Sequence, residues 1–223
     1  MFAIVFKMPE KSESDTSQFE GTASDALKIL KNRDIWILGV VFLIFNGILV
    51  GISSSYNNTF IEQVLGFSAQ EAGSIASLSM LLPIVVAPAT GAVFDRLPVG
   101  KRKFFMAFAM LVMFVGMFFL FTVGENAILH MWIFVVIGGV LGGLCAGSCR
   151  PMAPLVMPAT ALGATMSMAV LQFMQNIGQA VYSPLFGALL DSTGDWQFSL
   201  WVVALPTAAL AIVLCLFIRE RQK

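Results

Sequence analysis

Six long stretches of apolar residues, separated by short polar segments, make up most of the chain. A helix needs roughly 20 residues to cross a hydrocarbon core of about 30 Å, and each stretch is long enough. Lys, Arg, Asp and Glu are absent from all six, and the alternating pattern of a membrane β-barrel is absent as well. The pattern predicts six transmembrane helices, at residues 35–56, 73–94, 104–123, 128–148, 162–190 and 198–218.

Local signals refine the second of these stretches. Ser68 and Glu71 have the spacing of a capping box, in which side chains bond the first free backbone N–H groups of a helix. Pro83 and Pro88 lie inside the stretch, where neighbouring helices of a bundle can accommodate the freed carbonyl groups. We therefore expect a kinked membrane helix here.

Composition agrees with a membrane location. The chain is 58% hydrophobic and 12% charged, with a mean hydropathy of +0.86, outside the usual range of a soluble domain. Its formal net charge is zero and its pI about 6.6, so nothing in the charge balance indicates nucleic acid as a partner.

Basic residues fall on one side of the predicted helices, and short basic loops stay on the cytoplasmic side of a membrane. They lie before the first stretch, between the second and third, at the end of the fourth and after the sixth: Lys7, Lys11, Lys28, Lys31, Arg33, Arg96, Lys101, Arg102, Lys103, Arg150, Arg219, Arg221 and Lys223. The other loops carry only acids, such as Glu62, Glu125, Asp191 and Asp195. We expect a multi-pass protein of the plasma or inner membrane with both termini in the cytoplasm.

A short motif recurs at corresponding places in the two halves of the chain. "GAVFD" at 91–95 and "GALLD" at 187–191 each end the second helix of a set of three. The predicted topology puts the first copy on the cytoplasmic side and the second on the opposite side. This placement fits an inverted repeat of three plus three helices.

The loop after residue 91 resembles a signature of the major facilitator superfamily of secondary transporters, which reads roughly G-x-x-x-D-R/K-x-G-R/K-R/K. The matching residues are Gly91, Asp95, Arg96, Gly100, Lys101 and Arg102. The chain departs from the signature at 97–99, where three residues replace the usual one. "LKNRDIW" at 30–36 is similar to the lead-in to the seventh helix of such carriers, and the segment 175–196 to their eleventh helix and following turn.

This resemblance implies an all-α membrane protein forming the carboxy-terminal six-helix half of a twelve-helix carrier. Residues 1–34 would then hold the end of a preceding helix and a polar cytoplasmic linker, residues 35–219 the bundle and residues 220–223 a cytoplasmic tail. A short interfacial helix near 25–31 and a disordered linker are both compatible with the linker's composition. Partners would be membrane lipid, an amino-terminal half or a second copy, and an unknown small solute moved by alternating access. The resemblance also implies a gating role for Gly91, Asp95, Arg96 and Arg102.

Amide side chains provide candidate contacts to a solute or to another half. Gln172, Gln175, Asn176 and Gln179 fall within an arc of about 100° on one helix, and an unpaired amide facing lipid is costly. Asn46 is the lone amide in the middle of the first stretch. For all of these, a hydrogen bond to a neighbouring helix is the alternative to a solute contact.

Two further groups of residues carry weaker expectations. Tyr56, Asn57 and Asn58 are typical of a solvated helix end. Separately, the predicted helices contain no charged residue, and an uncharged cavity wall weakly favours a neutral solute, although a partner half could supply charges. Gly139, Gly143 and Gly147 recur at intervals of four, beside Gly138, Gly142 and Ala146 at the same interval. Such small residues allow close helix packing, either static or sliding.

Catalysis and cofactors find little support in the sequence. The three cysteines form no C-x-x-C pair, the single His130 has no partner at metal-ligand spacing, and no phosphate-binding glycine loop occurs. The predicted helices contain no activated nucleophile, so we expect neither an enzyme nor a metal or cofactor site. A non-transporting six-helix scaffold, or a truncated remnant needing a partner half, is the alternative to a carrier.

Overall fold

The computed structural model describes residues 30–122, 126–156 and 160–219, and these residues form helices joined by short turns, without a strand. The elements are α2 (Arg33–Asn46), η2 (Gly47–Ile52), α3 (Ser53–Gln63), α4 (Ala69–Arg96), α5 (Arg102–Met117), α6 (Ala127–Val156), α7 (Ala161–Thr193) and α8 (Trp196–Phe217). The expected preceding helix end and most of the linker, in residues 1–29, lie outside the described residues.

Four helical segments are long and apolar enough to cross a membrane: Arg33–Gln63, Ala69–Arg96, Ala127–Val156 and Trp196–Phe217. Helices α5 and α7, which we also expected to cross the membrane, do not meet this criterion of length and apolarity. Helix α5 has only 16 residues, and α7 carries the side-chain amides that lower its hydropathy. The chain is therefore a helical membrane protein with several apolar helices.

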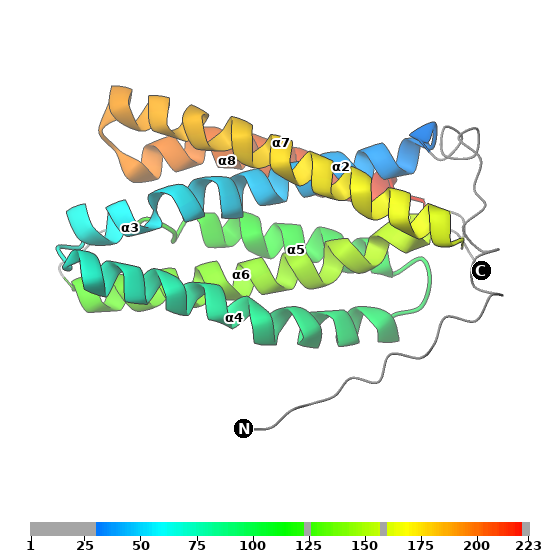
Figure 1. Ribbon diagram of the computed structural model, residues 1–223, viewed down its shortest axis with the longest axis horizontal. Helices are drawn as coiled ribbons and strands as arrows, with labels where there is room; N and C mark the ends of the chain where they lie inside the picture. Colours follow the sequence, from blue (N-terminus) through cyan, green and yellow to red (C-terminus); the bar gives the residue numbers. More distant parts are fainter. Residues whose placement is uncertain (1–29, 123–125, 157–159, 220–223) are drawn as a thin grey trace, which may run out of the picture.

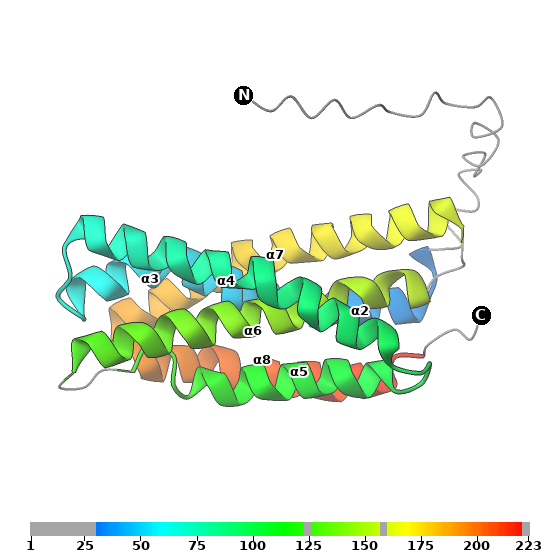
Figure 2. The ribbon, with the colours of Figure 1, turned by 90° about the horizontal axis from the view of Figure 1, so that it is seen from below.

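The helices run side by side along the long axis of the bundle (Figure 1). Helix α4 packs against α6, α5 against α8, and α2 with η2 against α7; the view from below shows the first two pairs (Figure 2). The loop between α4 and α5 and the starts of α2 and α7 lie at one end of the bundle. The α3–α4 and α7–α8 connections lie at the other end.

The first apolar stretch is one continuous helical segment with a π-helical turn in its middle. Helix α2 passes into η2 at Asn46, and η2 passes into α3 at Ser53, with right-handed helical backbone throughout. Gly47 and Gly51 of η2 face α7, where a Cβ would lie 2.5 Å from the Tyr182 ring and 3.1 Å from the Gln179 backbone. The absence of side chains at these two positions lets α7 approach closely.

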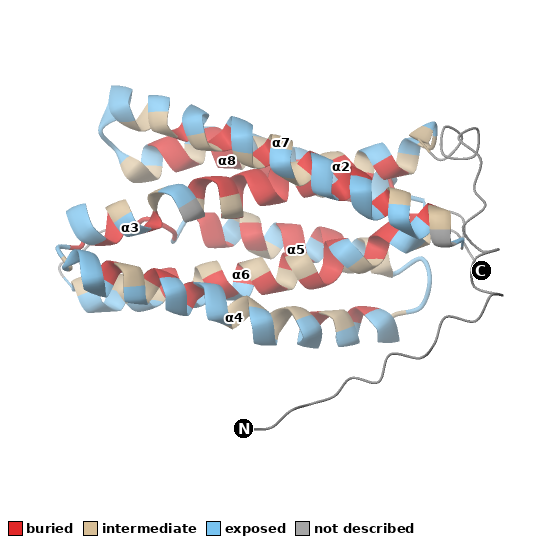
Figure 3. Ribbon diagram, viewed as in Figure 1, coloured by how far each residue is buried: buried red, intermediate tan, exposed pale blue. Residues whose placement is uncertain are grey.

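Buried residues face the interior of the bundle and apolar residues also cover its outside (Figure 3). On α4, for example, Ile84 is 66% and Val85 72% exposed. Apolar side chains on the outer surface are expected where the surrounding medium is hydrocarbon, since lipid takes the place of a protein partner.

Two local expectations can be compared directly with the helices. The capping box is confirmed: the Glu71 backbone N–H donates to Ser68 Oγ, and the Ser68 backbone N–H donates to Glu71 Oε2. The third stretch, expected to be helical to residue 123, instead ends its helix at Met117 and continues as a turn. In this turn Phe121 has a φ of +57° and is buried. Packing among aromatic rings explains why the helix gives way there.

Candidate functional site

A cavity of about 320 Å³ opens between the first helical segment and helices α4, α6 and α7. This volume lies at the lower end of the range for small-molecule sites. Its lining residues are Phe45, Asn46, Leu49, Val50, Ser53, Asn57, Ser79, Met80, Pro83, Phe134, Gly138, Gly142, Ala146, Arg150 and Gln175. Most of the wall is apolar, with a few polar groups at separate points.

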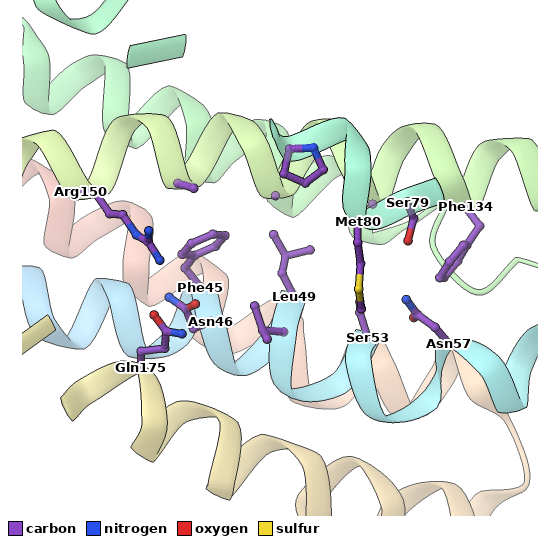
Figure 4. A pocket seen from close by; sticks show the side chains of 15 residues that line it. Phe45, Asn46, Leu49, Ser53, Asn57, Ser79, Met80, Phe134, Arg150 and Gln175 are labelled. Carbon is purple, nitrogen blue, oxygen red and sulfur yellow. The ribbon is translucent and has the colours of Figure 1, made fainter. Parts of the chain in front are cut away.

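One end of the cavity combines a cation with two amides. The side chains of Arg150 from α6, Asn46 from α2 and Gln175 from α7 gather there (Figure 4). Asn46 is buried and its Nδ2 donates to the Phe42 carbonyl oxygen at 2.9 Å, a bond within its own helix. This bond lies within one helix, and a contact of the Asn46 amide with a solute or with a neighbouring helix stays a prediction. Gln175 Oε1 is buried and has no hydrogen-bond donor among the described residues.

The other end of the cavity is polar but uncharged and backs onto an aromatic cluster. Asn57, Ser79 and Phe134 lie there (Figure 4). Phe134 stacks on Phe60, with ring centroids 6.2 Å apart, and Phe60 meets Phe121 edge to face at 4.8 Å. Such aromatic contacts stabilise beyond the area they bury, so this end of the cavity has a rigid wall.

Asn57 corrects an expectation. We expected a solvated helix end at this position, but the side chain is only 5% exposed and its Oδ1 has no donor among the described residues. The helix continues to Gln63, so Asn57 lies well inside the helical segment rather than at its end.

Two adjacent stripes of small residues on α6 face different surroundings. Gly139, Gly143 and Gly147 pack against α4: a Cβ on Gly143 would lie 2.5 Å from Val86 Cβ, and one on Gly147 would lie 2.5 Å from the Ala87 carbonyl oxygen. Gly138, Gly142 and Ala146 line the cavity instead. The first stripe lets two backbones approach, and the second leaves open space.

The loop between α4 and α5 is held by Arg102. Its Nε donates to the Leu97 carbonyl oxygen at 3.0 Å and its Nη2 to the Asp95 carbonyl oxygen at 3.2 Å, while the guanidinium lies 5.4 Å from the centre of the Phe94 ring. Gly100 has a φ of +91°, which glycine adopts without strain. The side chains of Asp95, Arg96 and Lys101 are exposed, and Gly91 lies in α4 with the Gly147 carbonyl oxygen 3.9 Å from the position of a Cβ.

The structure separates the amides that the sequence grouped on one helix face. Gln175 lines the cavity with Asn46, whereas Gln172, Asn176 and Gln179 do not. Gln172 and Asn176 are exposed and bond each other at 3.4 Å, and Gln179 lies against Gly51 of η2.

Arg150 is the lining residue that sequence reasoning missed. Its charge was grouped with the basic residues that set topology, and the cavity wall was expected to be uncharged. The signal was present: 150 is the next step after 138, 142 and 146 in the interval of four that defines the cavity-facing stripe.

The chemistry available at this site is binding. Among the described residues, no group of three or more His, Cys, Asp or Glu is placed to hold a metal ion. Of the lining residues within the described part of the chain, Arg150 is the only charged one and none is a cysteine or a histidine. An arginine and a few amides can bind and orient a solute through hydrogen bonds, but they provide no activated nucleophile.

An apolar helical bundle with a mainly apolar, amide-bearing cavity is compatible with a membrane transport protein. The sequence model of the Major Facilitator Superfamily matches residues 1–168 and, in a second alignment, residues 35–223. The chain belongs to this superfamily of transporters.

Individual relatives include the lysosomal dipeptide transporter MFSD1 of Homo sapiens, 23% identical over 221 residues, which cover 97% of this chain and 45% of the relative. The Mus musculus protein of that name is 25% identical over 219 residues, covering 97% and 46%. The raffinose permease of Escherichia coli is 28% identical over 113 residues, covering 51% of this chain and 26% of the permease. The chain thus spans about half the length, or less, of these relatives.

Proposed function

We propose that the chain is the carboxy-terminal half of a secondary carrier that moves a small solute by alternating access. All six apolar stretches would cross the membrane, with the short α5 completed by the turn that follows it. The observation that carries the proposal is the cavity whose wall brings Asn46, Gln175 and Arg150 together inside a bundle of this superfamily.

Helix pairing supports an inverted three-plus-three repeat. The two triplets are the first segment with α4 and α5, and α6 with α7 and α8. If the two triplets are equivalent, each contact between them should have a counterpart with the triplets exchanged. The contact of α2 with α7 has its counterpart in the contact of α6 with α4, and that of α2 with α8 in that of α6 with α5. The contact of α5 with α8 is its own counterpart. The repeated motifs follow the same rule, since Gly91 faces Gly147 of α6 and Gly187 faces Tyr56 of α3.

The distribution of charge supports cytoplasmic termini in a plasma or inner membrane. The end of the bundle with the α4–α5 loop carries Lys31, Arg33, Arg96 and Lys101, and the opposite end carries Glu62 and Asp191. Basic residues are retained on the cytoplasmic side. The MFSD1 relatives are lysosomal by name, so an internal membrane is the competing location.

The α4–α5 loop is proposed to bias the carrier between its states. Gly91 and Gly100 shape the helix end and the turn, Arg102 holds the loop, and the exposed Asp95 and Arg96 are free to meet another part of the carrier. Exposed ion pairs contribute about 0–1 kcal/mol, which is enough to bias states close in energy.

The packing of Gly139, Gly143 and Gly147 on α4 is proposed to serve movement as well as assembly. The Leu82 and Val86 side chains of α4 lie against Gly139 and Gly143, and because the glycines have no side chains of their own, nothing on α6 at these positions would obstruct a shift along α4 as the bundle rocks. The exposed Gln172 and Asn176 are proposed to face the other half of the carrier, together with Gln179 nearby on the same helix.

Alternating access requires an opposing bundle, so the partner is part of the proposal. The partner is either a second copy of the chain or a separate amino-terminal half. Light scattering of the purified chain, with the detergent mass subtracted, distinguishes these two possibilities. A mass of about twice 24.1 kDa supports a carrier built from two copies. A monomer supports a half that needs a separate amino-terminal partner.

Counterflow into proteoliposomes then tests transport, with radiolabelled dialanine and raffinose as probes chosen from the relatives' names. We expect uptake of at least one probe above empty liposomes, and its loss in the Asn46→Ala, Gln175→Ala double variant. Gln63→Ala, an exposed amide outside the cavity, is the control and should transport normally. Absence of uptake for the dimer, or for the chain joined to its partner half, would favour the scaffold or remnant instead.

A further inference from the structure

The cavity carries a positive charge that no described residue balances. Among the lining residues that the structure describes, Arg150 is the only charged one, and Asp and Glu are absent. Arg150 is exposed, and no hydrogen bond or ion pair joins it to another described residue. The site as built therefore attracts anions.

The surroundings of Arg150 keep space open in front of the guanidinium. Along the same face of α6, the positions one, two and three steps of four before it are Ala146, Gly142 and Gly138. Gly138 has no atom within 4 Å of the place where a Cβ would stand. A solute lying along this stripe would meet backbone and small side chains before it reached the guanidinium.

Two buried acceptors supplement the cation. Gln175 Oε1 lies at the same end of the cavity as Arg150, and Asn57 Oδ1 at the other end (Figure 4). Neither has a donor among the described residues, and a buried acceptor without a donor is costly. Both side chains line the cavity, so rotation of either amide would turn its acceptor toward an N–H or O–H group of a bound molecule.

We propose that the cavity selects a carboxylate-bearing solute, with the carboxylate on Arg150 and hydrogen-bond donors of the solute on Gln175 and Asn57. A guanidinium presents paired N–H groups that match the two oxygens of a carboxylate. Asn46, which lies beside Arg150 and Gln175 at one end of the cavity, and Asn57 at the other end are eleven helical positions apart, or about 16 Å. This span suits a solute of several bonds' length rather than a small inorganic ion.

This inference rests on the proposed function, because it takes the cavity to be the solute's binding place. It replaces the neutral solute that an uncharged wall would favour. The competing explanation for Arg150 is an ion pair with an acid from the partner half, and the experiment separates the two.

The test compares two probes that differ in a single group: N-acetyl-dialanine, which has a free carboxylate, and its carboxamide. Equilibrium binding to the purified chain in lipid nanodiscs is measured for both by titration calorimetry. We expect the carboxylate to bind about 10- to 100-fold more tightly than the amide, as loss of a charge-assisted hydrogen bond predicts.

Variants of Arg150 test whether this residue causes the preference for the carboxylate probe. Arg150→Gln should bind both probes with the weak affinity that the unaltered chain has for the carboxamide probe. Arg150→Lys should keep part of the preference, since lysine keeps the positive charge but lacks the paired N–H groups of a guanidinium. Arg33→Gln makes the same charge change at an exposed residue outside the cavity and should behave like the unaltered chain. Circular dichroism and a single elution peak confirm that each variant is folded.

Several results would overturn the proposal. These are equal binding of the two probes, no binding of either, or a carboxylate preference that survives Arg150→Gln. Counterflow distinguishes this failure from failure of the transport proposal. Transport without a carboxylate preference would support the carrier and contradict the carboxylate proposal. Carboxylate-specific binding without transport would support the carboxylate proposal and contradict the carrier.

Discussion

Gly147 of α6 lies directly against Ala87 of α4, so closely that a Cβ on the glycine would be 2.5 Å from the alanine carbonyl oxygen. The same Cβ would be 3.1 Å from the backbone nitrogen of Gly91. These two neighbours are backbone atoms, and the third, the Cβ of Thr90 at 2.7 Å, is bonded directly to its backbone, so no side-chain rotation can relieve the contact. The two helices can only move apart.

We therefore expect Gly147→Ala to destabilise the bundle. Overpacking of this kind costs about 1–3 kcal/mol, or roughly 2–12 °C in the unfolding midpoint of a chain this long. A thiol-reactive dye can follow unfolding in detergent, since Cys145, Cys149 and Cys215 are free and buried. Gly138→Ala is the matched control because that position faces open space, and it should be neutral or slightly stabilising. Equal midpoints for the two variants would contradict the packing argument.

Arg102→Gln should loosen the loop between α4 and α5. The substitution removes the two bonds to the Leu97 and Asp95 carbonyl oxygens. We expect amide hydrogen exchange in residues 97–101 to rise roughly 3- to 10-fold, as the loss of about 1 kcal/mol predicts. Lys101→Gln changes the same charge at an exposed neighbour and should leave exchange unchanged. An equal rise in both variants would mean that net charge, not the bonds of Arg102, orders the loop.

Asp95→Asn separates the structure of the loop from its proposed gating role. Arg102 bonds the backbone carbonyl of Asp95, not its carboxylate, so the loop should exchange at its normal rate in this variant. If the carboxylate meets another part of the carrier in one state, counterflow should fall while solute binding persists. Normal counterflow would remove Asp95 from the gate.

Ser68→Ala should weaken the start of α4. The variant loses the side-chain acceptor for the Glu71 N–H and the hydroxyl bond to Glu71 Oε2, at a cost of about 1 kcal/mol. Exchange of the first-turn amides of α4 is the sensitive measurement. Ser74→Ala is a suitable comparison, since that exposed hydroxyl only bonds the Gln70 carbonyl within the helix. Comparable exchange in the two variants would mean that the capping bonds contribute nothing.

Much of the helical architecture follows from the sequence because charge and apolarity change sharply at helix ends. Ser68 caps the start of α4 where the capping pattern predicted, and the charged segment 95–103 separates α4 from α5 as expected. The early end of α5 did not follow, because Phe121 leaves the helix to pack with rings that are distant in sequence.

The candidate site was only partly predictable for a similar reason. Asn46 and Gln175 were identifiable because an amide among apolar residues is conspicuous in either helix. Arg150 was obscured by its resemblance to a topological charge, and the burial of Asn57 depends on how far α3 continues. Which amide of α7 reaches the cavity depends on how that helix is rotated against η2, and no periodicity within a single helix can specify this.

The two neighbouring stripes on α6 also bear on how such a carrier could change its selectivity over time. Enlarging a residue at 139, 143 or 147 would disturb the joint with α4, whereas enlarging one at 138 or 142 would mainly reduce the room for a solute. If the cavity binds the solute as proposed, the residues for assembly and for selectivity lie one position apart and can change nearly independently. Mutation could narrow the range of accepted solutes in small steps, and a protein engineer could do the same, without redesigning the bundle.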